Sequence, residues 1–150
     1  MRITQGLTRA AAVRPVGIAT IDGERVRTWR EVEDRVARFA GALREFGIRP
    51  GDRVAVLAQN CDAFFEAYFA IAWAGGVIVP LNTRLAPAET RFQLQDAGAK
   101  LLIFGAEFVE AAHGLKGAVE TLRTLVGFDG KDGVADAAYE DLIAANAPAA

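Results

Sequence analysis

The chain has 150 residues, of which 52% are hydrophobic and 24% charged, a composition that indicates one folded domain and excludes a disordered chain. The formal net charge is −2, and acidic and basic residues are mixed along the chain, which argues against nucleic acid as a partner. The single cysteine, Cys61, cannot form a disulfide within the chain, which fits a reducing compartment such as the cytoplasm.

The N-terminal segment allows two interpretations. It carries three arginines and no acidic residue before Asp22, as an amphipathic transit peptide would. The interpretation that we prefer is a short helix from about Thr4 to Val13, which Pro15 ends because proline cannot continue a helix.

A β-hairpin is predicted next. Asp22-Gly23 lies between the apolar, partly β-branched run 17–21 and the run 24–27. Asp-Gly favours a type I′ turn, which needs positive φ at both central positions, so we expect two antiparallel strands joined by a tight turn.

Thr28 then begins a long helix. Glu31 lies three residues on, so the two side chains can form a capping box, and Gly47 is a natural residue after the last turn. An apolar stripe repeats at spacings of four and three, at Val32, Val36, Phe39, Leu43 and Phe46. The charged residues between them are expected to form a solvated face, at Glu33, Asp34, Arg35 and Arg38.

The rest of the chain alternates between apolar strands and helices. Nearly continuous apolar runs predict buried parallel strands at 53–58, 77–81, 100–104 and 124–128. Helices are predicted from a cap at Asn60 to about 74, from Pro87 to Gly98, over about 107–115 and over 135–145. This order predicts an α/β fold with a mostly parallel sheet, flanked by helices and preceded by the hairpin. We expect one domain over 1–145, with 146–150 as a linker or truncated end.

The stretch AWAGGVIVPLN (72–82) raises the question of a phosphate loop or a membrane segment. A phosphate loop needs its glycines before a helix, whereas Gly75 and Gly76 follow one. Residues 63–81 hold one charge, Glu66, over nearly the length of a membrane span, but the glycines and Pro80 interrupt any helix. We therefore interpret the stretch as a tight joint between a buried helix and a buried strand.

Other candidate residues also have simpler interpretations. Cys61 could be a nucleophile, but a small buried residue at a helix start is the preferred reading. His113 has no cysteine or carboxylate cluster near it in sequence, so a metal site is not expected. The loop 127–133 lacks the spacing of a P-loop or an EF-hand and is expected to be a turn. The residues alone therefore predict a domain without an assembled catalytic or metal site.

Three stretches nevertheless form an ordered set with characteristic spacings. The first holds RTWREV (27–32), AGAL (40–43) and GIRPGDRV (47–54); the second holds residues 60–69, AWAGGVIVPLN, Arg84-Leu85 and PAE (87–89); the third is LQDAGAK (94–100). The set, over about residues 3–128, resembles the N-terminal region of acyl-CoA synthetases in the adenylate-forming superfamily. PLNTRL followed by PAE is more similar to fatty-acyl and related CoA ligases than to peptide-synthetase domains.

The resemblance implies the N-terminal subdomain of the acetyl-CoA-synthetase-like fold and a two-step ligase reaction in the full-length family. A carboxylic acid attacks ATP, with Mg²⁺, to give an acyl-adenylate and pyrophosphate; the thiol of coenzyme A then displaces AMP. The family's phosphate loop, its nucleotide-binding segments and its C-terminal catalytic lysine have no match here, so no catalytic residue is carried over. Arginines that touch the coenzyme A nucleotide in some acetate-type relatives are replaced here by Glu107-Phe-Val-Glu110.

Three hypotheses follow. The first is the N-terminal part of a fatty-acid type carboxylate–CoA ligase, inactive alone, whose partner is the remainder of the ligase. The second is a free-standing truncated paralogue that binds a partner protein through the same face, and a homo-oligomer also stays open. The third is a nucleotide-binding doubly wound domain, which would need a glycine loop between a strand and a helix.

Overall fold

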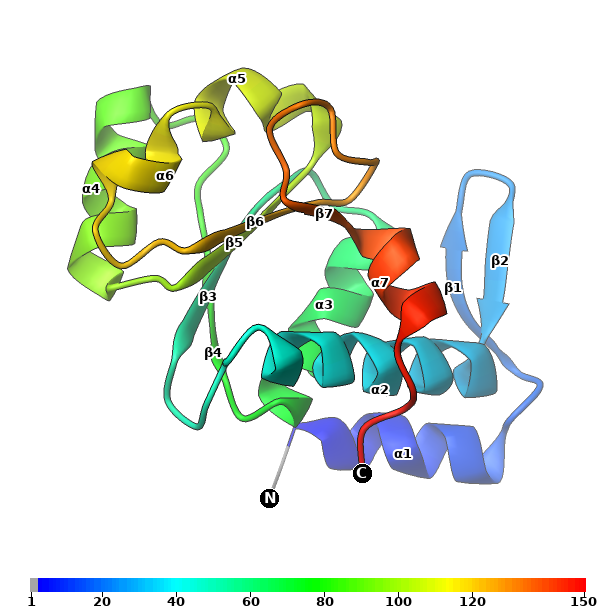
Figure 1. Ribbon diagram of the computed structural model, residues 1–150. Helices are drawn as coiled ribbons and strands as arrows, with labels where there is room; N and C mark the ends of the chain where they lie inside the picture. The colour runs from blue at the N-terminus through cyan, green and yellow to red at the C-terminus, as the bar shows by residue number, and fades with distance from the viewer. Residues whose placement is uncertain (1–2) are drawn as a thin grey trace.

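The computed structural model describes residues 3–150 as an α/β fold with a separate hairpin (Figure 1). Five parallel strands form one sheet in the order β4-β3-β5-β6-β7. Their bounds are β3 Arg53–Leu57, β4 Val77–Pro80, β5 Leu101–Phe104, β6 Thr124–Gly127 and β7 Ala137–Ala138. The antiparallel hairpin consists of β1 Ile18–Asp22 and β2 Arg25–Thr28. The predicted fold class is therefore confirmed.

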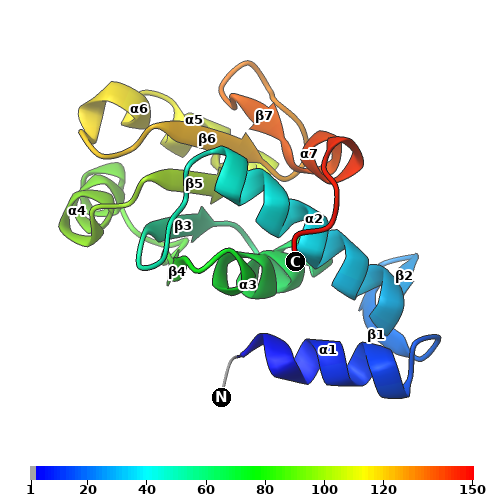
Figure 2. The same ribbon diagram turned by 60° about the horizontal axis from the view of Figure 1, so that its bottom comes forward.

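Helices cover both faces of the sheet (Figure 2). One face packs against α2 Trp29–Glu45, α3 Asp62–Trp73 and α7 Tyr139–Ala145, and α1 Thr4–Val13 lies outside α2 and α3. The other face packs against α4 Pro87–Ala97, a 3₁₀ turn η1 Ala106–Phe108, α5 Val109–Ala112 and α6 Leu115–Ala118. Alternate residues of each strand point to opposite faces, so Val54 and Val56 belong to the first core while Ala55 and Leu57 belong to the second.

Local start and stop signals predict several elements correctly. The first helix has the predicted bounds, and its Leu7 and Ala11 are buried. Glu31 accepts a hydrogen bond from the backbone N–H of Thr28 at 2.7 Å, and the Thr28 hydroxyl accepts one from the N–H of Glu31 at 3.4 Å. Gly98 ends α4 in the left-handed conformation.

Four expectations about local structure are wrong. The hairpin turn is Gly23-Glu24, with positive φ at Gly23 alone, because Asp22 pairs with Arg25 as the last residue of β1. Cys61 caps α3 in place of Asn60. The predicted helix over 107–115 is broken into η1, α5 and α6, because His113 is extended and Gly114 is left-handed. The predicted last helix begins only at Tyr139, after the unpredicted strand β7.

The joint between α3 and β4 has the predicted form. Gly75 follows the last turn of α3 with φ +92°, and a Cβ there would lie 3.3 Å from Cγ of Pro50. A Cβ on Gly76 would lie 3.1 Å from Cγ2 of Ile71 and 3.3 Å from the backbone oxygen of Asp52. The two glycines therefore let a buried helix turn directly into a strand of the sheet.

A buried carboxylate joins three elements around α3. Glu66 is fully buried, with an exposed fraction of 0%. Its Oε1 accepts a hydrogen bond from Nε of Arg35 at 2.8 Å and lies 3.6 Å from Nε of Arg27, and its Oε2 accepts one from the hydroxyl of Tyr139 at 2.9 Å. Glu66 therefore connects α3 with α2, β2 and α7.

A second carboxylate on α3 holds the hairpin. Asp62 is buried and pairs with Arg27 and with Arg25, whose Nε lies 2.6 Å from Oδ2 of Asp62. Asp22 accepts a hydrogen bond from the backbone N–H of Asp62 at 3.1 Å. We call Arg25, Arg27, Arg35, Asp62, Glu66, Tyr139 and Glu140 the charge cluster.

The expectation of a solvated charged face on α2 is wrong at one position. Arg35 lies mostly inside the charge cluster, where it also makes two parallel hydrogen bonds with the carboxylate of Glu140, at 2.6 and 2.9 Å. Asp34 and Arg38 do form an ion pair at the surface, as solvated residues of one helix face do. Residues 146–150, predicted as a linker or truncated end, lie along α2, where the N–H of Ala149 donates to the carbonyl of Ala37 at 2.9 Å.

The glycine joint can be tested with two substitutions to alanine. We expect Gly75→Ala to lower the free energy of unfolding by at least about 1–2 kcal/mol, because its positive φ disfavours a side chain, and contact with Pro50 adds to this loss. Gly6→Ala, in an open position of α1, should raise it by about 0.5–1 kcal/mol. Urea unfolding followed by tryptophan fluorescence measures both, and equal effects of the two substitutions would contradict this account.

The buried carboxylate can be tested in the same assay. Glu66→Ala leaves Arg35 and the Tyr139 hydroxyl without a buried partner, so we expect a loss of about 3–5 kcal/mol. The control Asp34→Ala removes a surface ion pair with Arg38 and should cost at most about 1 kcal/mol. Similar losses in both variants would show that the charge cluster does not hold the elements together.

Candidate functional site

The carboxyl ends of parallel strands are the place where α/β folds bind ligands. At this edge, Oε1 of Glu107 accepts a hydrogen bond from the backbone N–H of Gln59 at 3.3 Å, between the loops after β5 and β3. Oδ2 of Asp129 accepts one from the N–H of Ala106 at 2.9 Å, between the loops after β6 and β5. Glu107 and Asp129 therefore connect neighbouring loops through hydrogen bonds to backbone N–H groups.

The glycine pair at the end of α3 has the wrong surroundings for a phosphate group. The glycine pair Gly75-Gly76 lies at the carboxyl end of α3, where carbonyl groups disfavour an anion. Arg44 donates a hydrogen bond to the carbonyl of Trp73 at this end, at 3.0 Å. Within residues 3–150, no group of three or more histidine, cysteine or acidic residues is arranged to hold a metal ion. The glycine pair therefore lacks the placement of a phosphate loop.

The stretch 63–81 has the predicted division into helix and strand. Helix α3 ends at Trp73, and β4 begins at Val77 inside the sheet. Among the described helices, none is both long enough and apolar enough to cross a membrane.

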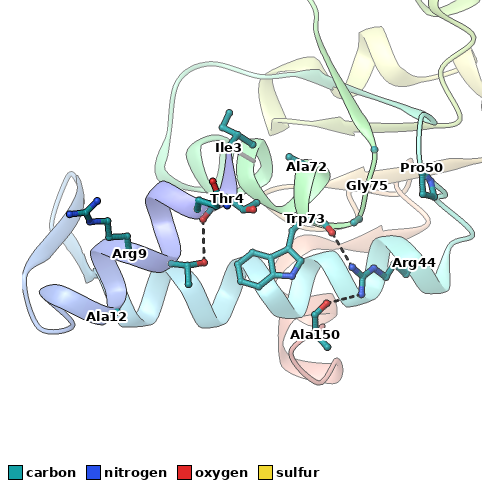
Figure 3. A pocket seen from close by; sticks show the side chains of 14 residues that line it. Ile3, Thr4, Arg9, Ala12, Arg44, Pro50, Ala72, Trp73, Gly75 and Ala150 are labelled. Carbon is teal, nitrogen blue, oxygen red and sulfur yellow. Dashed lines mark hydrogen bonds between the residues drawn. The ribbon is translucent and has the colours of Figure 1, made fainter. Parts of the chain in front are cut away.

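A hollow with a volume of about 1010 Å³ lies between α1, the end of α2 and the end of α3 (Figure 3). We call it the α1 groove. Trp73 lies near its centre, with Arg9 on the α1 side and Arg44 on the α2 side. Arg44 also donates a hydrogen bond to the backbone oxygen of Ala150 at 3.2 Å, so the last described residue lies on its rim.

The α1 groove has the chemistry of a packing surface. Its wall is mostly apolar and backbone atoms, from residues such as Ile3, Ala12, Pro50 and Trp73. Among its described lining residues, the ionisable side chains are Arg9 and Arg44, and neither a carboxylate, a cysteine nor a histidine side chain lines it. The hydroxyls of Thr4 and Thr8 also line the groove, and the Thr8 hydroxyl donates a hydrogen bond to the carbonyl of Thr4 at 3.2 Å. The groove therefore offers apolar contacts and two cationic side chains.

The charge cluster concentrates ionisable groups, and their ion pairs shift the pKa values of Asp62 and Glu140. Burial alone would raise the pKa of Asp62; hydrogen bonds from Arg25 and the charges of Arg27 and Arg25 outweigh it and lower that pKa. Hydrogen bonds from Arg35 lower the pKa of Glu140 in spite of its partial burial. Both carboxylates therefore stay ionised near neutral pH and are poor proton acceptors.

Two further members of the charge cluster, Arg35 and Tyr139, are held in one protonation state as well. Burial would lower the pKa of Arg35, but hydrogen bonds to Glu140 and Glu66 raise it. Burial and the nearby charge of Glu66 raise the pKa of Tyr139 well above its usual range, so its hydroxyl remains a donor. A general base needs a pKa near the working pH, so Asp62, Glu140 and Tyr139 are poor candidates for this role.

The candidates singled out from sequence lie apart from one another. Cys61 is half-buried at the start of α3, its Sγ accepts a hydrogen bond from the N–H of Phe64 at 3.4 Å, and burial raises the pKa of its thiol. A raised pKa suppresses the thiolate form that a nucleophile needs. His113 is exposed after α5, and two N–H groups donate to the carbonyl of Lys131 in a turn, as expected for the loop 127–133.

Sequence reasoning missed the roles of Glu66 and Tyr139. Glu66 is the only charged residue in the apolar stretch 63–81, and a lone charge on an apolar helix is a signal of a buried ion pair. Its partners lie 31 and 73 residues away in sequence, so only the fold identifies them.

Curated proteins with similar sequences are acyl- and aryl-CoA ligases. A feruloyl-CoA synthase from Amycolatopsis sp. is 44% identical over 107 residues, which are 71% of this chain and 22% of that protein. A long-chain-fatty-acid–CoA ligase from Thermus thermophilus is 35% identical over 116 residues, which are 77% of this chain and 21% of that protein. The chain therefore spans about a fifth of the length of these relatives.

Solved structures of such ligases share the fold. A benzoate CoA ligase from Burkholderia xenovorans matches with a TM-score of 0.87 and 29% identity, over 100% of this chain and 29% of that chain. The N-terminal domain of FACL13 from Mycobacterium tuberculosis matches with a TM-score of 0.87 and 28% identity, over 99% of this chain and 37% of that chain.

A family model agrees with these similarities. The model described as "AMP-binding enzyme" matches residues 7–147, which extends the match beyond the end near residue 128 that the sequence motifs suggest. The matched range includes the hairpin, the whole parallel sheet and α7. The chain therefore belongs to the AMP-binding enzyme family.

Proposed function

We propose that the chain forms the N-terminal part of an ATP-dependent carboxylate–CoA ligase. The observation that carries the proposal is its fold, which matches the N-terminal domain of FACL13 over 99% of its residues. In such a ligase, a carboxylate oxygen attacks the α-phosphorus of ATP and releases pyrophosphate. The sulfur of coenzyme A then attacks the acyl carbon and releases AMP.

The role proposed for these residues is to build and support the ligase domain. The glycine pair lies at the wrong end of a helix for phosphate, and the acids at the carboxyl edge of the sheet bind loop N–H groups. The charge cluster holds its side chains in paired states. We therefore expect the chain alone to be inactive and the remaining ligase polypeptide to be its partner.

A fatty acid is the substrate class that we propose first. The supporting relative is the long-chain-fatty-acid–CoA ligase of Thermus thermophilus, at 35% identity. An aromatic acid of the feruloyl type is the second candidate, favoured by 44% identity to a feruloyl-CoA synthase. A cytoplasmic location fits the single, unpaired thiol of Cys61.

A hybrid ligase tests the proposal. Residues 7–147 replace the structurally matching segment of the Burkholderia xenovorans benzoate CoA ligase, and formation of benzoyl-CoA is measured by absorbance. We expect a kcat within about 100-fold of the parent enzyme, because no reacting group is exchanged and misplacement by about one ångström costs about that factor. The chain alone should give no ATP–pyrophosphate exchange.

The parent enzyme and a version without the segment serve as controls. A folded hybrid that forms neither adenylate nor thioester would contradict the proposed role. Exchange by the chain alone at an enzyme-like rate would show instead that these residues catalyse by themselves.

A further inference from the structure

The hairpin is turned with its polar face toward the domain. The register pairs Thr20 with Arg27 and Asp22 with Arg25, so these four side chains share one face of the two-stranded sheet. That face meets the start of α3, where both arginines and Asp22 bind Asp62. The usual arrangement of a half-buried sheet, apolar inside and polar outside, is therefore inverted here.

The opposite face of the hairpin is apolar and open. Ile21 and Val26 are direct cross-strand partners, with exposed fractions of 68% and 51%. A register shift between Ile18 and Thr20 inserts one residue, which brings Ile18, 60% exposed, onto the same outer face. We call Ile18, Ile21 and Val26 the outer patch.

The outer patch lacks a covering element among residues 3–150. In Figure 1 the hairpin stands at one end of the molecule, away from the parallel sheet, with its base near α2. A two-stranded hairpin is marginally stable in water, and its outer strand edges present unpaired N–H and C=O groups. Clustered β-branched side chains beside such edges are typical of an interaction site, whereas single exposed apolar residues are not.

We propose that the outer patch is a docking surface for an apolar strand or sheet of the ligase polypeptide beyond the segment matched here. The inference rests on the proposed function. Its support is the amount of polypeptide that the relatives carry outside the match, since the chain covers 22% of the feruloyl-CoA synthase and 29% of the benzoate ligase structure. The patch itself is uncharged, which suits an apolar face better than an anionic or cationic partner.

Amide hydrogen exchange tests the docking in the hybrid ligase and in the chain alone. We expect the amides of β1 and β2 to exchange at least about tenfold more slowly in the hybrid, because docking removes local opening and covers the strand edges. If other surfaces of the chain contact the ligase and the hairpin does not, the amides of β1 and β2 will exchange equally fast in the hybrid and in the chain alone.

Paired substitutions localise the contact. The double variant Ile21→Thr/Val26→Thr keeps β-branched residues in both strands. We therefore expect the melting temperature of the isolated chain to stay unchanged. In the hybrid, the same double variant should lower the melting temperature and abolish the exchange protection of the amides in β1 and β2. The control is Phe92→Gln on α4, at the other end of the molecule and 66% exposed, which should leave hairpin protection in place.

The outcomes separate this proposal from the proposed function. A hybrid that is inactive but has a protected hairpin overturns the ligase role and leaves the docking surface standing. An active hybrid whose hairpin exchanges as fast as in the chain alone overturns the docking surface. Concentration-dependent dimerisation of the chain alone, with hairpin protection that the double variant removes, would overturn it in favour of a second copy.

Discussion

A carboxylate buried away from water needs hydrogen-bond and charge partners. Glu66 on α3 imposes this constraint on α2, α7 and the hairpin. Its burial costs free energy unless hydrogen bonds and opposite charges compensate for lost hydration. Arg35 and Tyr139 supply the hydrogen bonds and Arg27 supplies a further charge, each from a different element. Helix α2, the hairpin and α7 can therefore take only those positions that bring all three groups to the same point of α3.

The same constraint explains the unusual orientation of the hairpin. Arg25 and Arg27 must face inward to neutralise Asp62 and Glu66, and alternation along a strand then sends their neighbours outward. Ile21 and Val26 are exposed because of where the arginines are needed. The ion network and the open apolar face are thus two results of one pattern of alternating residues.

Signals within one turn or one helix could be read from the sequence, and contacts between distant segments could not. The capping box of Thr28 and Glu31, the end of α4 at Gly98 and the turn at Gly75 after α3 have local signals, and each forms as predicted. The close approach of Pro50 and Asp52 to the glycine joint involves a distant segment, which the local sequence does not reveal. Strand β7 has only two residues, which is too few for a periodic sequence signal. It is a strand because it pairs with β6. The sequence around Arg35 predicts a solvated residue, because its partners Glu66 and Glu140 lie on α3 and α7, far away along the chain.

The connection between α2 and α7 also has a consequence for the order of folding. Arg35 meets Glu140 across 105 residues of sequence, and Tyr139 meets Glu66 across 73. Contacts of such separation form late, because closing long loops costs chain entropy before the contact stabilises anything. During synthesis the hairpin, α2 and α3 emerge well before α7, so the most deeply buried charge acquires its last partner only when that helix has been made.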